Sequence, residues 1–178
     1  MYTAPTRHYH NFQHIADCLE QFSLVRSLAT DPLAVELAIW FHDAVYDTRA
    51  GDNEERSAEL ASSWLRPVAL QTTLVDSVCQ LVLATKAHKA GSHPDAALLV
   101  DVDLSILGQA EEKFWDYERK IREEYAWVES GLFAVKRAEI LENFLNRPQL
   151  YQTDLFRTRL ERQARTNLQT SIKRLRGL

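Results

Sequence analysis

The sequence predicts an all-α protein, a fold class supported by three observations. Glycine and proline, the residues that most often interrupt helices, each occur only five times in 178 residues. No segment sustains the alternation of apolar and polar residues that marks a half-buried strand. Apolar residues instead recur every three or four positions along most of the chain, which is the spacing of helices that each bury one stripe.

Capping residues predict where two of these helices begin. Asp31 followed by Pro32 is typical of a helix start, because aspartate caps the first turn and proline fits its first position. We expect this helix to run towards Ala44. Asp52 and Glu55 have the spacing of a capping box, whose two side chains bind backbone N–H groups, and they predict the start of the next helix.

Apolar spacing predicts the remaining helices. Residues 96–107 are almost continuously apolar and precede Gly108, so we expect a central buried helix that ends at a C-terminal glycine. The last helix is predicted over residues 154–175. The other stripes are Ile15, Leu19 and Phe22; Leu74, Val78, Leu81, Val82 and Thr85; Phe114, Tyr117, Ile121 and Tyr125; and Phe133, Ile140, Leu141 and Phe144.

Length and composition limit the classes of protein to consider. A chain of 178 residues suits one domain, expected over residues 1–178, and can bury roughly 70% of the surface of its unfolded form. With 21 basic and 25 acidic residues the net charge is −4, which argues against general nucleic-acid binding. No apolar run approaches the roughly 18 residues of a membrane span, and residues 1–7 lack the features of a signal peptide. We therefore expect a cytoplasmic protein without a membrane or a specific nucleic-acid partner.

Cysteines and tryptophans are expected to be structural. Cys18 and Cys79 are far apart in the chain, and each lies in an apolar helical pattern, so neither a disulfide framework nor a thiolate zinc site is expected. We interpret both as small core residues. The tryptophans are interpreted as core aromatics, although one could stack on a base. They are Trp40, Trp64, Trp115 and Trp127.

Three motifs carry polar side chains that folding alone does not explain easily. They span residues 9–14 (YHNFQH), 40–46 (WFHDAVY) and 99–106 (LVDVDLSI). Asp43 and Asp103 lie among apolar neighbours, where an unpartnered carboxylate is costly to bury and a divalent cation would stabilise it. His14 adds a neutral nitrogen ligand just before an apolar stripe begins.

The adjacent pair His42 and Asp43 limits the geometry of such a site. On a helix their side chains diverge by about 100°, so further ligands must come from other helices. Imidazole and carboxylate without thiolate suit Mn, Fe, Co, Ni, Zn or, more weakly, Mg. Taken singly, a His-Asp pair arises often by chance, His14 is explained as a residue at a helix start, and Asp101 as a cap or ion-pair partner. The ordered set on separate helices favours a metal site.

The order His14, His42-Asp43, Asp103 resembles the HD superfamily of metal-dependent phosphohydrolases. Longer strings are similar to a bacterial subgroup described as predicted HD-superfamily phosphohydrolases. These strings are RHYHN at 7–11 with His14, WFHD at 40–43, DNE at 52–54 with SA at 57–58, and DVDLSILG at 101–108. The resemblance runs from about Arg7 to the last helix.

This resemblance implies an all-helical HD fold with a divalent metal ion at its centre. It implies that the ligands are His14, His42, Asp43 and Asp103, with Asp101 as the second choice for the last of them. It does not imply a substrate, because members resembling this subgroup have no firmly known one.

Further side chains are candidates for catalysis and substrate binding. Glu54 follows the His-Asp pair at a helix start, where it either activates the attacking water or stabilises the first turn. His88 extends a buried stripe, so it either points into the site or caps that helix. Arg122, Arg137 and Lys86 are candidates to bind phosphate oxygens, and a pair with a helical glutamate is the alternative for all three.

The expected function is hydrolysis of a phosphomonoester or nucleotide by a divalent metal ion that activates water, with Asp43 both anchoring the ion and taking part in catalysis. The expected partner is a small phosphorylated molecule, and a homodimer is left open. One alternative is a nucleotide sensor without catalysis. Another is a di-iron oxygenase, for which His88 and Asp101 are the spare ligands.

Overall fold

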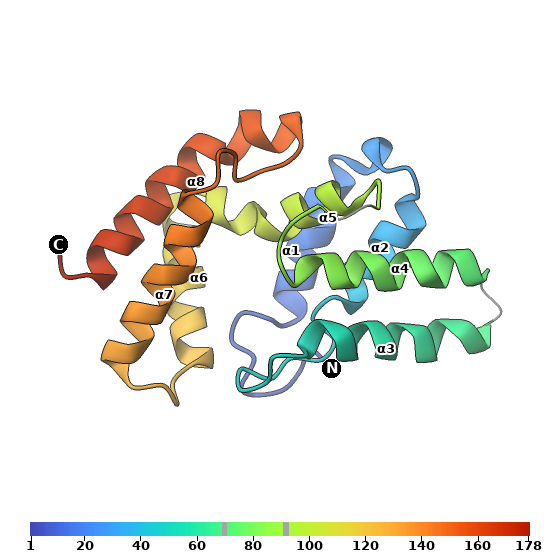
Figure 1. Cartoon of the computed structure of the whole chain (residues 1–178), viewed down its shortest axis with the longest axis horizontal. Helices are drawn as coiled ribbons and strands as arrows, with labels where there is room; N and C mark the ends of the chain where they lie inside the picture. The colour runs from blue at the N-terminus through green and yellow to red at the C-terminus, as the bar shows by residue number, and fades with distance from the viewer. Residues whose placement is uncertain (69–70, 91–92) are drawn as a thin grey trace. The chain divides into compact units, whose positions relative to one another are not determined.

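The computed structural model describes residues 1–68, 71–90 and 93–178, and within these ranges every regular element is helical and no strand is present. Eight α-helices and three short 3-10 helices are present in this described part (Figure 1). The all-α fold class predicted from the sequence is therefore confirmed. The chain divides into two compact units, Met1–Asp103 and Leu104–Leu178, and the single domain expected over residues 1–178 stays a prediction.

The described residues of the first unit contain five α-helices. α3 and α4 run antiparallel side by side (Figure 1), α2 packs against α4, and α1 packs against α2 and α5. Apolar stripes from all five helices form the core, which contains Ile15, Phe22, Ile39, Leu81 and Leu99. The elements are α1 (Phe12–Ser23), η1 (Arg26–Leu28), α2 (Pro32–Phe41), α3 (Asn53–Leu65), η2 (Arg66–Val68), α4 (Thr72–Thr85) and α5 (Ala96–Asp103).

Aspartates fix the beginning of α2. Asp31 Oδ1 accepts hydrogen bonds from the N–H groups of Leu33 (3.1 Å) and Ala34 (3.0 Å), so the start predicted from Asp31 and Pro32 is confirmed. The buried carboxylate of Asp95, just before α5, accepts hydrogen bonds from the N–H groups of Thr30 and Asp31. This contact ties the chain ahead of α2 to the chain ahead of α5.

Two predictions about local structure in this unit are wrong. α3 begins after Asp52 as predicted, but the expected capping box is absent: the Asp52 side chain makes no capping hydrogen bond, and Glu55 pairs with Lys86 after the end of α4 instead. Helix α2 ends at Phe41 rather than near Ala44, because the chain turns there and the Ala44 N–H donates to the Phe41 carbonyl.

The predicted central helix over residues 96–107 is two elements. α5 ends at Asp103, and the chain continues as the tighter 3-10 helix η3 (Leu104–Gly108), whose residues are all buried. Gly108 does not adopt the left-handed conformation of a C-terminal cap, so that interpretation is wrong. A Cβ atom at this position would lie 2.5 Å from Leu160 Cβ and 2.9 Å from the Tyr151 hydroxyl, so close packing requires the glycine.

The second unit consists of η3, α6 (Glu111–Glu124), α7 (Ser130–Leu145) and α8 (Asp154–Leu175), whose bounds match the predicted last helix. α8 packs against both α7 and η3. Asn167 of α8 donates hydrogen bonds to the carbonyls of Leu107 (2.8 Å) and Gln109 (2.9 Å), and this satisfies backbone groups where η3 ends.

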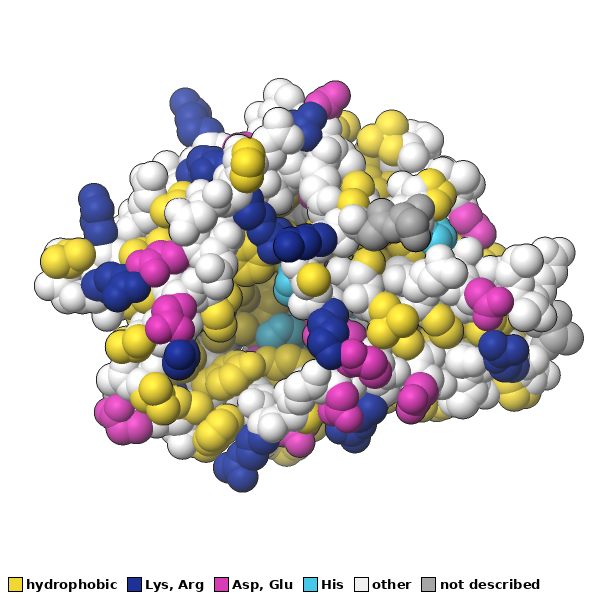
Figure 2. Space-filling view, viewed as in Figure 1, with side chains coloured by type: hydrophobic (Ala, Val, Ile, Leu, Met, Phe, Trp, Pro, Cys, Tyr) yellow, Lys and Arg dark blue, Asp and Glu magenta, His cyan; other side chains and the backbone are white. Residues whose placement is uncertain are grey.

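Surface exposure corrects part of the predicted core. The side chains of Trp40, Trp64 and Trp127 are 40–57% exposed, so these three tryptophans are not core residues. Acidic and basic side chains are interspersed on the face shown in Figure 2. None of the helices in the described ranges combines the length and the apolar character that a membrane crossing requires.

Candidate metal site

The four side chains predicted as ligands come together in the first unit. His14 lies in the first turn of α1, His42 and Asp43 follow the end of α2, and Asp103 is the last residue of α5. His14 and His42 are buried, and the side chains of Asp43 and Asp103 are 17% and 13% exposed. Three separate helix ends therefore deliver these side chains to one place.

The donor atoms of these residues face one another. His14 Nε2 lies 3.1 Å from His42 Nε2 and 3.4 Å from Asp43 Oδ2. His42 Nε2 lies 3.0 Å from Asp43 Oδ2. Asp103 Oδ1 lies 3.3 Å from His14 Nε2 and 3.5 Å from His42 Nε2.

These separations match the edges of a metal coordination sphere. Ligand atoms about 2.1 Å from one ion lie roughly 3.0 Å apart as neighbours in an octahedron and roughly 3.4 Å apart in a tetrahedron. The five separations of 3.0–3.5 Å among the four residues fall in this range. Two imidazole nitrogens and two carboxylates also form a donor set that divalent transition metals accept. The residues present therefore fit a divalent cation.

A hydrogen bond fixes the tautomer and orientation of His42. Its Nδ1 lies 2.9 Å from the carbonyl oxygen of Ile39. A carbonyl oxygen only accepts, so Nδ1 carries a proton and donates it, and Nε2 is the ring nitrogen that faces His14 and the carboxylates. Metal-binding histidines typically have such a second hydrogen bond.

Without a cation, protons hold the cluster together. Burial lowers the pKa of both imidazoles, but their neighbours outweigh it. Cys18 and Tyr9, followed by Asp103 and Asp43, hold the pKa of His14 well above the ordinary value of 6.5, and Asp43 and Asp103 do the same for His42. Burial raises the pKa of the two carboxyls, yet the neighbouring imidazoles hold the pKa of Asp43 and Asp103 well below 3.8. A cation binding here would displace the imidazole protons.

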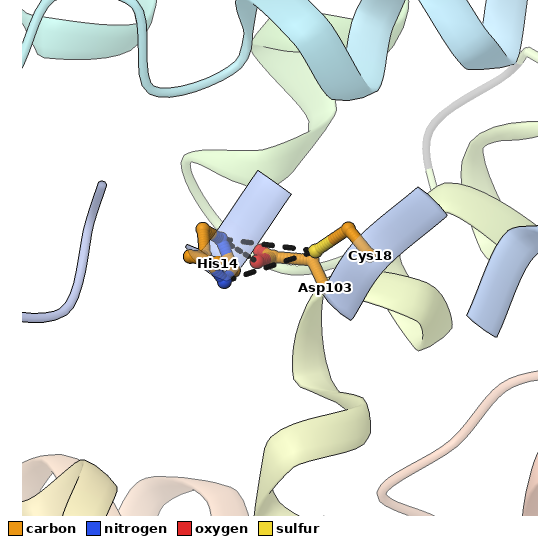
Figure 3. A group of neighbouring side chains, drawn as sticks. All are labelled: His14, Cys18 and Asp103. Atoms are coloured by element: carbon orange, nitrogen blue, oxygen red, sulfur yellow. Dashed lines mark hydrogen bonds and ion pairs between the residues drawn. The ribbon is translucent and has the colours of Figure 1, made fainter. Parts of the chain in front are cut away.

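Cys18 is a neighbour of the cluster that the sequence reasoning missed. Its Sγ lies 3.8 Å from both ring nitrogens of His14, which precedes it by one turn of α1. His14, Cys18 and Asp103 form a second group of potential metal ligands (Figure 3). The core location predicted for Cys18 agrees with its burial. The four-residue spacing from His14, which puts two residues on one helix face, was the signal in the sequence.

Arg7 connects the first motif to the turn that carries His42 and Asp43. Its buried guanidinium donates hydrogen bonds to the carbonyls of His10 (3.1 Å), Asp43 (2.6 Å) and Ala44 (3.0 Å). These carbonyls lie outside the helices, since His10 precedes α1 and Asp43 and Ala44 follow the end of α2. The arginine of the RHYHN string thus fixes the backbone on both sides of the candidate site.

The DNE and SA strings stabilise the chain that follows the His-Asp pair. Ser57 Oγ accepts a hydrogen bond from the Val45 N–H (3.0 Å) and donates one to the Val45 carbonyl (3.3 Å). Asn53 makes the same kind of paired contact with the backbone of Asp47, at 3.0 and 2.9 Å. Both side chains come from α3, so this helix holds the residues that follow Asp43 in place.

Among the other candidates, His88 lies at the cluster. Its Nε2 is 3.3 Å from Asp103 Oδ2, so the prediction that it points inward at the end of α4 agrees with the structure. Asp101 is fully buried on α5 but belongs to neither group of potential ligands found among the described residues. Glu54 lies in the first turn of α3 and is half-buried.

The three basic residues predicted to bind phosphate have protein partners. Lys86 pairs with Glu55 and donates to the Gly51 carbonyl. Arg137 forms a buried ion pair with Glu118, as the alternative interpretation expected. Arg122 donates to backbone carbonyls within the second unit rather than to a glutamate: those of Tyr125 (2.6 Å) and Val128 (3.0 Å).

Comparison with known proteins gives no relative for this chain. No protein family matches it, and neither the curated proteins nor the solved structures contain a significant match. The function therefore has to be inferred from the geometry of the candidate metal site and from the motifs of the sequence.

Proposed function

We propose that the protein is a metal-dependent phosphohydrolase of the HD type that binds a divalent cation through His14, His42, Asp43 and Asp103. One observation carries the proposal: donor atoms from three helix ends lie 3.0–3.5 Å apart, the spacing of ligands around a common ion. The order of these residues in the sequence, which resembles the HD superfamily, supports the same assignment.

A bound divalent cation would supply the chemistry by lowering the pKa of water and polarising a phosphoryl oxygen. The protein residues supply the framework for that step. His42 is held by the Ile39 carbonyl with Nε2 facing inward, and Arg7 fixes the carbonyl of Asp43 and thereby the turn that carries its carboxylate. Glu54 and His88 remain the candidates to move a proton at the leaving group or at the attacking water.

The proposed substrate class is a small phosphomonoester, with nucleotides as the leading candidates. Four protein ligands leave positions free around a six-coordinate ion, which a phosphate oxygen and water would occupy. Lys86, Arg122 and Arg137 stay proposals for phosphate binding, although each would have to exchange or share its present protein partner.

The test combines metal analysis with a substrate screen. The full chain is stripped with a chelator, reloaded separately with Mn, Fe, Co, Ni, Zn or Mg, and assayed for phosphate release from nucleoside monophosphates and p-nitrophenyl phosphate. We expect one ion per chain and metal-dependent release of phosphate. His42→Ala and Asp103→Asn should lower the rate by more than about 100-fold, beyond the loss typical of residues that only support a ligand. Asp76→Asn, an exposed carboxylate paired with Arg66, is the matched control and should keep full activity.

Three outcomes would contradict this function. A metal-loaded protein that releases no phosphate from any compound would exclude hydrolysis. A nucleotide that raises the melting temperature and is recovered intact would indicate a sensor instead. Two iron ions per chain would favour an oxygenase.

A further inference from the structure

His88 has an unusual backbone conformation for a residue with a side chain. It lies in the turn after α4, which ends at Thr85, and its φ of +46° is in the left-handed region. Among the described residues, His88 shares a positive φ only with a glycine. Its N–H donates to the Thr85 carbonyl at 3.1 Å, which ends the helix. Any residue could make that backbone contact, and glycine would adopt the conformation without strain. The histidine side chain therefore needs a separate explanation.

The side chain of His88 contacts the outer oxygen of a predicted metal ligand. Its Nε2 lies 3.3 Å from Asp103 Oδ2, and the other oxygen of the same carboxylate, Oδ1, lies 3.3 Å from His14. The two carboxylate oxygens of Asp103 thus have different partners: Oδ2 contacts His88 and Oδ1 contacts His14. About one-third of the His88 side chain is exposed, compared with 13% for Asp103, so His88 is the more exposed of the two.

We propose that His88 is a positioning residue that holds Asp103 in the orientation required to bind the cation. Nε2–H donates to Oδ2, because a carboxylate oxygen only accepts, and this contact directs Oδ1 towards His14 and His42. The left-handed backbone turns the chain at the end of α4 so that the imidazole reaches α5. Strained conformations of this kind persist where the side chain has a role. This inference rests on the metal-binding part of the proposed function.

The experiment separates the side chain from the backbone with two opposite substitutions. His88→Gly removes the imidazole and relieves the strain at φ +46°, whereas His88→Gln keeps an N–H donor near the position of Nε2 and retains the strain. Binding of Mn²⁺ and Co²⁺ to the chelator-treated full chain is measured by calorimetry, together with the visible spectrum of the Co²⁺ form. Unfolding of the metal-free variants in urea reports stability.

Cation affinity and the stability of the metal-free protein are expected to change in opposite directions. His88→Gly should bind the cations about 10–100-fold more weakly, with an altered Co²⁺ spectrum, while its metal-free form is at least as stable as the parent protein. His88→Gln should be the less stable variant and yet recover part of the affinity. A role limited to ending α4 would affect stability and leave the Co²⁺ spectrum unchanged.

The outcomes that overturn the proposal are distinct. If the parent protein binds the cations and His88→Gly binds them equally well with the same spectrum, His88 does not position Asp103, and the proposed metal site still stands. If the parent protein binds neither cation, both this inference and the metal-binding part of the proposed function are overturned.

Discussion

Arg7 shows how one residue supports the geometry of a whole site. Its guanidinium binds three backbone carbonyls on both sides of the cluster, and its charge lies 5.3 and 5.5 Å from the ring centres of Tyr2 and Tyr46. Leaving a buried carbonyl without a hydrogen-bond donor lowers the stability of the fold, since water does not readily replace the donor. The side chain therefore contributes to stability as well as to the position of Asp43.

We predict that Arg7→Met lowers the free energy of unfolding by about 2 kcal/mol or more, because it leaves buried carbonyls without a donor. It should also weaken cation binding, since the turn after α2 loses its anchor. Urea unfolding and calorimetric titration measure the two effects. Arg26→Met is the control: its exposed pair with Glu36 should contribute less than about 1 kcal/mol. Equal effects of the two substitutions would contradict this role of Arg7.

At the same scale, the imidazoles predict how cation binding depends on pH. Their neighbours outweigh burial and hold the pKa of both His14 and His42 above 6.5, so protons compete with a cation for the site in the metal-free protein. The affinity for a divalent cation should therefore rise with pH, by about tenfold per unit for each displaced proton. Calorimetry in two buffers of different ionisation enthalpy counts the protons released. An affinity independent of pH between about 6 and 8 would contradict this prediction.

The same pKa shifts predict how the stability of the metal-free fold depends on pH. A raised histidine pKa contributes stability that is fully present below 6.5 and is lost as the pH rises through the folded-state value. A lowered pKa at Asp43 and Asp103 contributes stability that is present above 3.8 and is lost as the pH falls. The contribution of the cluster is thus greatest between these two limits.

At the scale of an element, the end of α2 determines what the His-Asp pair can do. On a continuing helix the side chains of His42 and Asp43 would diverge by about 100°. The helix ends at Phe41 instead, and in the turn that follows, His42 Nε2 and Asp43 Oδ2 come within 3.0 Å. The early end of the helix therefore lets two consecutive residues face the same point.

The packing of η3 gives a prediction for the second unit. Gly108→Ala would place a methyl group 2.5 Å from Leu160 Cβ and 2.9 Å from the Leu160 carbonyl, too close for a rigid helix backbone to accommodate. We expect a loss of about 2 kcal/mol in the free energy of unfolding, measured in urea. Gly51→Ala is the matched control, because no atom lies within 4 Å of the added methyl, and it should be neutral or slightly stabilising. Equal stabilities of the two variants would show that η3 and α8 can move apart.

At the scale of the whole molecule, cation binding should stabilise the native state against unfolding. A ligand at about 100 times its Kd adds roughly 2.7 kcal/mol if the unfolded chain does not bind it. We expect slower amide hydrogen exchange in α1, at the end of α2 and in α5, the elements that carry the four side chains. Hydrogen exchange with and without Co²⁺ measures this, and the Asp103→Asn variant should show no cation-dependent protection. Protection that persists in Asp103→Asn would assign the cation to another place.

The sequence predicts the helices well because they depend on local pattern. The start of α2 follows from Asp31 and Pro32, and the whole of α8 follows from its apolar spacing. The convergence of His14 with Asp103 was predicted from the cost of burying a carboxylate and from the resemblance to a family. That these residues bind a metal ion stays a prediction.

What the sequence did not predict depends on contacts distant in the chain. Glu55 has the spacing of a capping box, but the ammonium group of Lys86 on another helix competes for its carboxylate. Trp40 and Trp64 are apolar enough to be predicted as core residues, but the fold leaves their indole side chains exposed. The left-handed conformation of His88 has no signal in the sequence, because it is set by tertiary packing.

The predicted ligands lie far apart along the chain, and this has a consequence for folding. A cation shared by His14 and Asp103 would close a loop of 103 − 14 = 89 residues, which contains every α-helix of the first unit from α2 to α4. It would act as a reversible cross-link, comparable in its position to a disulfide that joins the two ends of a domain. Removing it with a chelator would release both ends of that loop together, so a protease should then cut the first unit more readily even where no cleavage site touches the metal.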